Sequence, residues 1–136
     1  MPRKERLKSK TGYYHVMIRG IDKQIIFEDE FDKNKFLLCI KNAVNNYEVK
    51  VICYCLMINH VHLIIYDSNN SISRFMQSLN CKYAAYFNNK YLRIGPLFHD
   101  RYKSEVINDD RQLLAAYRYV LNNPYKAGIC SAENYK

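Results

Sequence analysis

The sequence contains no long hydrophobic run. Its longest apolar segment, "VICYCLMI", has eight residues, whereas a membrane-spanning helix needs about 20. The basic start "MPRKERLKSKTG" is not followed by an apolar stretch of signal-peptide length. We therefore expect a cytoplasmic protein.

Glycine and proline are also scarce, with four and three residues in a chain of 136. No repeat or Pro/Gly-rich linker divides the sequence, so we expect a single domain over 1–136. The five cysteines are odd in number and irregularly spaced, which indicates reduced core residues rather than a disulfide framework. They are Cys39, Cys53, Cys55, Cys81 and Cys130.

Acidic residues are outnumbered by basic ones, 13 to 21, which gives a net charge of +8. This excess favours a polyanionic partner, most often a nucleic acid. Tryptophan is absent but there are 13 tyrosines, and aromatic rings among basic groups suit the stacking of single-stranded bases. A solvated basic surface without a partner is the alternative interpretation.

The hydrophobic periodicity predicts an α+β fold with the element order βαββαβ and one further helix. This order is the ferredoxin-like arrangement, with an antiparallel sheet and two helices on one face. The other face would be free for a site. Strands are predicted over 13–20, 49–55, 60–66 and 102–107, and helices over 31–47, from Ser71 onward, and from 109 to near Pro124.

Two of the four histidines lie in the third predicted strand, in "HVH" at 60–62. Side chains alternate across a strand, so His60 and His62 project from one face. Two imidazoles on one face suit Mn²⁺ or Zn²⁺. Two alternatives stay open: a pair of half-exposed histidines without a role, and a Cys₂His₂ zinc site completed by Cys53 and Cys55.

The last predicted helix carries a tyrosine outside its apolar stripe. Around Tyr119 the helical wheel places only polar or small residues, and Asn123 follows four positions later on the same side. A phenol has a pKa of about 10 and is a weak nucleophile, but a metal or an arginine can stabilise the phenolate, and tyrosine can form covalent intermediates. The apolar stripe consists of Leu113, Leu114, Tyr117 and Leu121.

Taken in their order, six segments resemble the Y1-type HUH transposases, that is, the IS200-like transposases and their REP-associated tyrosine transposase relatives. The resemblance covers nearly the whole chain. The segments are "YYHVMIRG", "IIFEDEFD", "LMINHVHLII", "ISRFMQSLNCKYAAYFN", "GPLFHDRYKSEVI" and "LLAAYRYVLNNPYKAGI".

The resemblance implies a metal-dependent enzyme that nicks and rejoins single-stranded DNA bearing short hairpins. It implies that His60, His62 and Asn123 hold Mg²⁺ or Mn²⁺ and that Tyr119 forms a 5′-phosphotyrosine. The sequence departs from the family pattern at Ile58, where relatives usually have proline. The candidates for phosphate contacts are Arg3, Lys4, Arg6, Lys8, Arg101, Lys103 and Arg118.

Several alternatives remain within this interpretation. Tyr117 is a second tyrosine in the same helix, but it lies on the apolar stripe, and we favour Tyr119 as the nucleophile. The fold could also serve as a non-catalytic or decayed single-stranded nucleic-acid-binding module. The chain could act as a monomer or as a homodimer whose exchanged last helices place the tyrosine in trans. A histidine phosphoesterase is set aside, because only one H-x-H motif is present.

Overall fold

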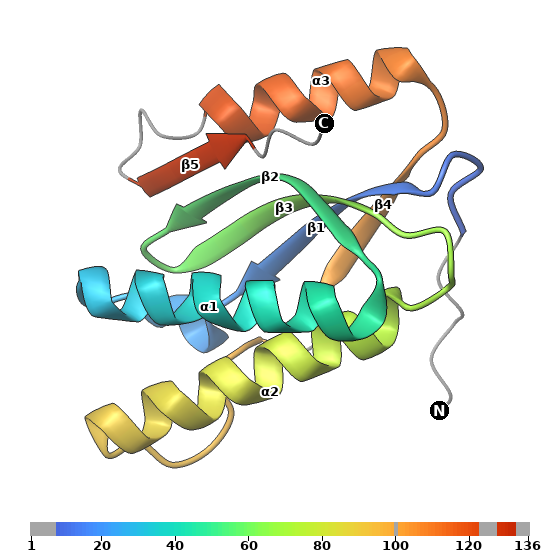
Figure 1. Cartoon of the computed structure of the whole chain (residues 1–136). Coiled ribbons are helices and arrows are strands. Elements are labelled where there is room, and N and C mark those ends of the chain that lie inside the picture. Colours follow the sequence, from blue (N-terminus) through green and yellow to red (C-terminus); the bar gives the residue numbers. More distant parts are fainter. Residues whose placement is uncertain (1–7, 100, 123–127, 133–136) are drawn as a thin grey trace.

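The computed structural model describes residues 8–99, 101–122 and 128–132. The described chain alternates strands and helices in the predicted order (Figure 1). Its elements are β1 (Tyr13–Arg19), the short 3₁₀ helix η1 (Ile21–Lys23), α1 (Glu30–Tyr47), β2 (Lys50–Met57), β3 (His60–Tyr66), α2 (Ile72–Tyr91), β4 (Lys103–Ile107), α3 (Asp110–Asn122) and β5 (Gly128–Ala132).

The strands form one antiparallel sheet in the order β4-β1-β3-β2-β5. The first four strands have the ferredoxin-like order that the sequence predicts, so the α+β fold class is confirmed. The fifth strand was not expected. It pairs with the outer edge of β2, from Met57 opposite Gly128 to Cys53 opposite Ala132, and so continues the sheet beyond the predicted four strands.

Helices cover both faces of this sheet (Figure 1). α1 and α2 pack side by side on one face, as predicted, while α3 lies across the other. The expectation that the second face is free was therefore wrong: α3 buries Val120 completely and packs Tyr117 near Ile64 of β3. Among the described residues, no helix is both long and apolar enough to cross a membrane.

Alternation along β1 and β3 separates the main hydrophobic core from the face beneath α3, which carries both polar side chains and a smaller apolar cluster. Tyr14, Val16 and Ile18 are buried toward α1 and α2, as the alternating pattern predicts. β3 contributes Val61 and Leu63 to the same core. The residues that alternate with these core positions, among them His60 and His62, therefore lie on the face that α3 partly covers.

The apolar stripe of α3 is rotated relative to the prediction. Leu114 is 49% exposed, whereas the residues that face the sheet are Leu113, Ala116, Tyr117, Val120 and Leu121. These positions recur at intervals of three and four residues, as one helix face requires. Leu114 is turned by about 100° from Leu113 and falls outside that face.

The cysteines differ from the prediction at two positions. Among the described residues, Cys39 and Cys53 are buried free thiols, as expected. Cys81 is also a free thiol, but it is exposed, so the expectation of a core residue is wrong there. Cys55 is instead disulfide-bonded, so the expectation of a reduced thiol is wrong there. In the register of β2 with β5, the backbone of Cys55 lies opposite that of Cys130. The sequence analysis did not include this strand pairing, because β5 was not expected.

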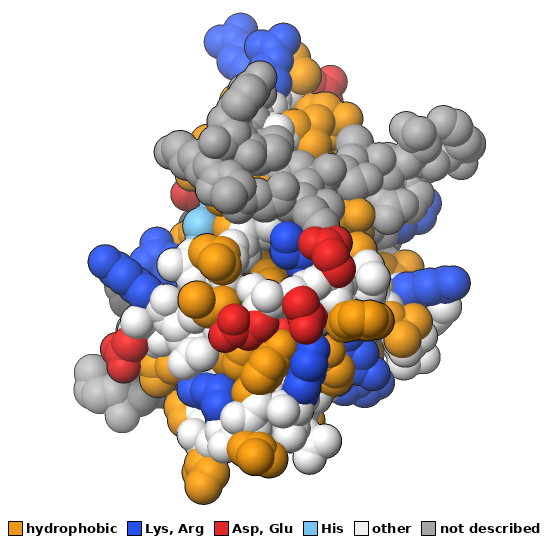
Figure 2. Space-filling view, turned by 90° about the vertical axis from the view of Figure 1, so that its left-hand side faces the viewer, with side chains coloured by type: hydrophobic (Ala, Val, Ile, Leu, Met, Phe, Trp, Pro, Cys, Tyr) orange, Lys and Arg blue, Asp and Glu red, His pale blue; other side chains and the backbone are white. Residues whose placement is uncertain are grey.

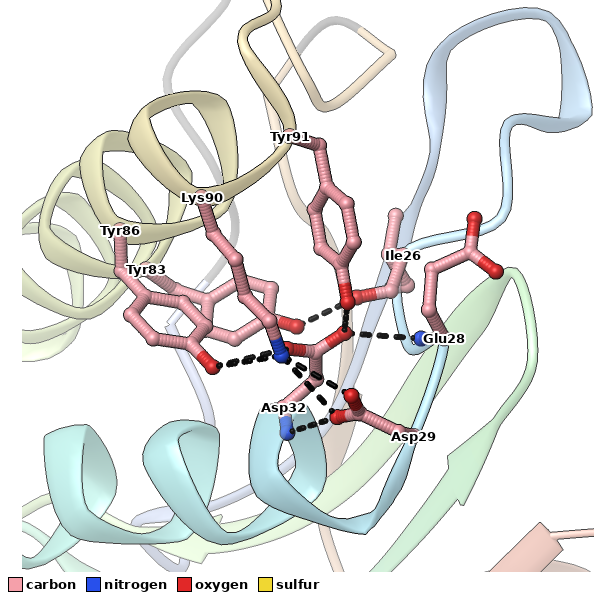
Figure 3. A network of polar contacts seen from close by, with 8 residues as sticks. All are labelled: Ile26, Glu28, Asp29, Asp32, Tyr83, Tyr86, Lys90 and Tyr91. Carbon is pink, nitrogen blue, oxygen red and sulfur yellow. Dashed lines mark hydrogen bonds and ion pairs between the residues drawn. The ribbon is translucent and has the colours of Figure 1, made fainter.

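A buried carboxylate connects α1 with α2 (Figure 3). Asp32 is fully buried, and each of its oxygens accepts two hydrogen bonds. Tyr86 Oη and Lys90 Nζ both donate to Oδ1 at 2.8 Å, and Tyr91 Oη and the Glu28 N–H donate to Oδ2 at 2.6 and 2.9 Å. Because the carboxylate is fully hydrogen-bonded, its burial is compensated.

These hydrogen bonds decide the pKa of Asp32. Burial by itself raises this pKa. The hydrogen bonds from Lys90 and Tyr91, together with weaker ones from the Glu28 N–H and Tyr86, lower the pKa by more than burial raises it, so that it lies below its usual value. A carboxyl group with a lowered pKa stabilises the fold above its unfolded-state pKa of about 3.9. That contribution is lost as the pH falls through the folded-state pKa.

We predict that Asp32→Asn lowers the free energy of unfolding by about 3 kcal/mol at pH 7, because a charged partner of Lys90 is removed from a buried position. The difference from the wild type should narrow below about pH 4, because there the unfolded chain binds a proton at this carboxyl group before the folded protein, whose pKa is lower, does so. Urea unfolding at pH 7 and pH 3 measures both. In the control, Glu30→Gln, an exposed ion pair with Lys33 at 3.5 Å is lost, and the change should be much smaller. If Asp32→Asn lowers the free energy of unfolding by the same amount at pH 7 and pH 3, the assignment of this stability to the ionised carboxylate is wrong.

Candidate active site

Strand pairing assembles a cluster of ionisable side chains on the face beneath α3. Arg19 of β1 lies opposite His60 of β3, and Glu105 of β4 lies opposite His15 of β1. Directly opposed residues in antiparallel strands project from the same face, and His62 is two positions beyond His60 on that face. Three adjacent strands therefore supply one polar surface.

The histidines of this cluster are held through their Nδ1 atoms. His62 Nδ1 lies 3.1 Å from His15 Nε2, and His60 Nδ1 lies 2.8 Å from Asn59 Oδ1. The other nitrogen of His15, Nδ1, lies 3.3 Å from Glu105 Oε1. Within the described part of the chain, neither His60 nor His62 has a hydrogen bond at Nε2.

Burial keeps these imidazoles neutral. It lowers the pKa of His62 to about 4, with further lowering from the neighbouring His15, His60 and Arg19. Burial also lowers the pKa of His60, and the positive charge of Arg19 adds to the effect. For His15 the lowering by burial exceeds the raising effect of Glu105. Neutral imidazole is the form that binds a metal ion.

Tyr119 lies on α3 directly above the histidines. Its ring centroid is 5.4 Å from that of His62 and 5.8 Å from that of His15, both edge-on. The side chain is 56% exposed, so its hydroxyl group is accessible to a ligand. Tyr117 packs instead into the apolar cluster between α3 and the sheet.

Two hollows meet at His62 and Tyr119, which line both. The first has a volume of about 510 Å³, and the second, between β4 and α3, about 660 Å³. The first is also lined by Arg19, Lys23, Asn59, His60 and His99. It therefore combines two basic side chains, the acidic Asp22, three histidines and a phenol.

Residues 8–123 match the model of a protein family described as "Transposase IS200 like". The chain belongs to the IS200-like transposase family. No curated protein matches its sequence.

Two solved structures are similar to this transposase in fold. One is a REP-associated tyrosine transposase bound to a REP hairpin, with a TM-score of 0.76 and 12% identity, covering 93% of this chain and 74% of the other. The second is a proposed transposase from Deinococcus radiodurans R1, with a TM-score of 0.60 and 15% identity, covering 89% and 97%. At such identities the likeness shows the fold alone.

The predicted phosphate-contact residues of this transposase are scattered. Lys103 lines the second hollow, whereas Lys8 lines a separate one near the start of β1. Arg101 and Arg118 are exposed outside these hollows. Arg3, Lys4 and Arg6 lie outside the described residues. On the face shown in Figure 2, basic side chains stand apart around a central acidic group and do not merge into one patch.

Two of the three predicted metal ligands, His60 and His62, lie among the described residues. Asn123 lies outside the described residues, and among those described, no group of three or more His, Cys, Asp or Glu side chains could hold a metal. The Cys₂His₂ alternative is not assembled: Cys55 is disulfide-bonded, and burial raises the pKa of Cys53 to about 12. The two bare Nε2 atoms fit a divalent ion that takes its remaining ligands from oxygen.

Three residues of the transposase site were missed in the sequence, namely His15, Arg19 and Glu105. For two of them the sequence carries a signal, because His15 and Arg19 alternate with the buried residues of "YYHVMIRG" and so project from the opposite face of the strand. What was absent was the register that places β1 between β3 and β4. Without this register, nothing in the sequence indicates that Glu105 lies opposite His15, 90 positions away, or that Arg19 lies opposite His60.

We predict that the His62 imidazole of the metal-free protein titrates at about pH 4, because its charged form is desolvated. Arg19→Gln should raise the pKa of His60, since the positive charge of Arg19 helps to lower it. The matched control, Lys41→Gln on the exposed surface of α1, should leave it unchanged. NMR titration of the histidine rings measures each value. A midpoint near 6.5 for His62 would show that the ring is solvated.

Proposed function

We propose that this transposase nicks and rejoins single-stranded DNA through a covalent 5′-phosphotyrosine at Tyr119, in a reaction that requires a divalent metal. One observation carries the proposal: an accessible phenol lies beside His62, and among the described residues neither histidine of the H-x-H motif has a hydrogen bond at Nε2. The family membership of residues 8–123 makes DNA transposition the context.

The metal would be Mg²⁺ or Mn²⁺, held by His60, His62 and Asn123. When bound, it would polarise a phosphodiester oxygen and make the phosphorus more electrophilic. Imidazole ligands suit Mn²⁺ better than Mg²⁺, which prefers oxygen. The lowered pKa values of both histidines keep their ring nitrogens available to the ion at neutral pH.

In the proposed reaction, Tyr119 Oη attacks the scissile phosphorus and loses its proton. A new bond forms between Oη and phosphorus, the bond from phosphorus to the 3′ oxygen breaks, and that oxygen leaves as a 3′-hydroxyl. The energy of the phosphodiester is kept in the tyrosyl ester. A 3′-hydroxyl of another strand can therefore reverse the reaction and join the DNA without a further energy source.

The lining of the first hollow has two basic side chains against one acidic side chain, Asp22, and this excess of positive charge supports a phosphate ligand there. Arg19 lies opposite His60 in the sheet, and Lys23 of η1 lines the same hollow. A guanidinium group can hold two phosphate oxygens at once. We propose that Arg19 and Lys23 orient the scissile phosphate toward Tyr119.

The arrangement supports action in cis. Tyr119 lies beside His62 and His15 of the same chain, so the site within one chain has both the nucleophile and the histidines. A monomer is therefore our proposal. For the substrate, the similar REP-associated tyrosine transposase was solved with a REP hairpin, which supports DNA with short hairpins as the ligand of this chain.

We predict a covalent protein–DNA band on a denaturing gel when the protein is incubated with hairpin-bearing single-stranded DNA and Mn²⁺. Because the tyrosyl ester would join the 5′ phosphate of the downstream fragment, a 3′-end label should move with the protein. A 5′-end label should appear in a shortened free strand. EDTA should abolish both products.

Tyr119→Phe should abolish the covalent band, because it removes only the hydroxyl. The matched variant Tyr117→Phe, in the same helix, should keep it. A band lost only in Tyr117→Phe would preserve the chemistry and overturn the assignment of the nucleophile. If the wild-type protein binds the DNA without forming an adduct, the binding-module interpretation replaces the enzyme.

A further inference from the structure

His15 and Glu105 have no part in the proposed chemistry, yet they lie in line with His62. They come from the three adjacent strands β4, β1 and β3, and their contacts measure 3.3 Å from Glu105 Oε1 to His15 Nδ1 and 3.1 Å from His15 Nε2 to His62 Nδ1. The carboxylate is at the solvent-exposed end of this row, with 81% of its side chain exposed, while the His15 side chain is only 13% exposed.

The direction of each hydrogen bond in this row follows from the groups themselves. An ionised carboxylate only accepts, so His15 Nδ1 must donate to Glu105. A neutral imidazole has one N–H and one bare nitrogen, so His15 Nε2 can only accept. The hydrogen between the two rings therefore resides on His62 Nδ1, and His62 Nε2 is bare.

His60 reaches the same state by a different contact. Its Nδ1 lies 2.8 Å from Asn59 Oδ1, and an amide oxygen only accepts, so Nδ1 carries the hydrogen and Nε2 is bare. Both histidines of the H-x-H motif are thus prepared in the same tautomer. A short-range contact sets one, and a row of two side chains from other strands sets the other.

We propose that Glu105 and His15 form a relay that fixes the tautomer and ring orientation of His62 and so presents Nε2 as a metal ligand. His15 is then a positioning residue, which acts through His62 and does not itself touch the substrate. The inference rests on the proposed function only where it assigns metal binding to His62 Nε2. The tautomer itself is a property of the metal-free protein.

The first test is therefore made without metal. In ¹⁵N-histidine-labelled protein, long-range ¹H–¹⁵N correlation spectra distinguish the nitrogen that carries the hydrogen. We expect His62 in the Nδ1–H form in the wild type. In His15→Leu, which leaves no acceptor, this form should give way to the Nε2–H form or a mixture. In His15→Gln, whose side-chain oxygen can accept, it should be kept.

The second test measures Mn²⁺ binding by calorimetry, with no DNA and no turnover. Groups that orient a metal-ligating histidine typically change affinity by about 10- to 100-fold when removed. We expect a weakening of this size in His15→Leu, substantial recovery in His15→Gln, and a smaller loss in Glu105→Ala. The control Glu30→Ala removes an exposed carboxylate of α1 and should leave the affinity unchanged.

The outcomes separate the relay from the proposed function. If His62 is in the Nε2–H form in the wild type, or keeps its tautomer in His15→Leu, the relay is wrong even if DNA is nicked. If the tautomer depends on His15 but Mn²⁺ does not bind the wild type, the tautomer control stands and the metal-dependent function fails. Substitution of the mostly buried His15 could disturb packing, whereas Glu105 is an exposed side chain of the edge strand β4. The Mn²⁺ affinity of Glu105→Ala therefore tests the relay without a change in the core.

Discussion

The pairing of β1 with β3 is the constraint on which the site depends. Its register places Arg19 opposite His60 and Met17 opposite His62, and it turns the alternating apolar residues of both strands into one core. A slip of β3 by one residue would move its side chains to the opposite face, which would turn His60 and His62 toward α1 and α2 and remove Leu63 from the core between those helices and the sheet. Burial of the apolar side chains thus stabilises the one register that also brings Arg19, His60 and His62 together.

One face of the sheet carries most of the hydrophobic core, and the other carries the candidate site. On one face, α1 and α2 enclose most of the core and are joined through the buried Asp32 carboxylate. On the other, α3 packs only its inner side, with Val120 and Tyr117 against the sheet. This packing fixes the rotation of the helix, and Tyr119 is consequently turned toward the histidines while remaining accessible.

Sequence patterns were sufficient wherever the information was local. The third strand has the predicted bounds, and the separation of Tyr119 from the apolar stripe follows from helical periodicity. Information that depends on contacts between distant segments was not accessible from the sequence. It comprises the contacts of Glu105 with His15 and of His15 with His62, the additional strand β5, the disulfide state of Cys55, and the rotation of α3 that exposes Leu114. The metal-ligand role of His60, His62 and Asn123, the nucleophilic role of Tyr119, and the proposed phosphate contacts stay predictions.

The most direct measurement is the mass of the peptide that carries the DNA. Trypsin cleaves after Arg118, so it separates Tyr117, in "QLLAAYR", from Tyr119, in "YVLNNPYK". After reaction with Mn²⁺ and nuclease digestion, the account predicts a 5′-linked nucleotide on the second peptide, with fragmentation placing it on Tyr119 and not on Tyr125. A nucleotide on "QLLAAYR", on Tyr125, or on no tyrosine of this chain would contradict the account.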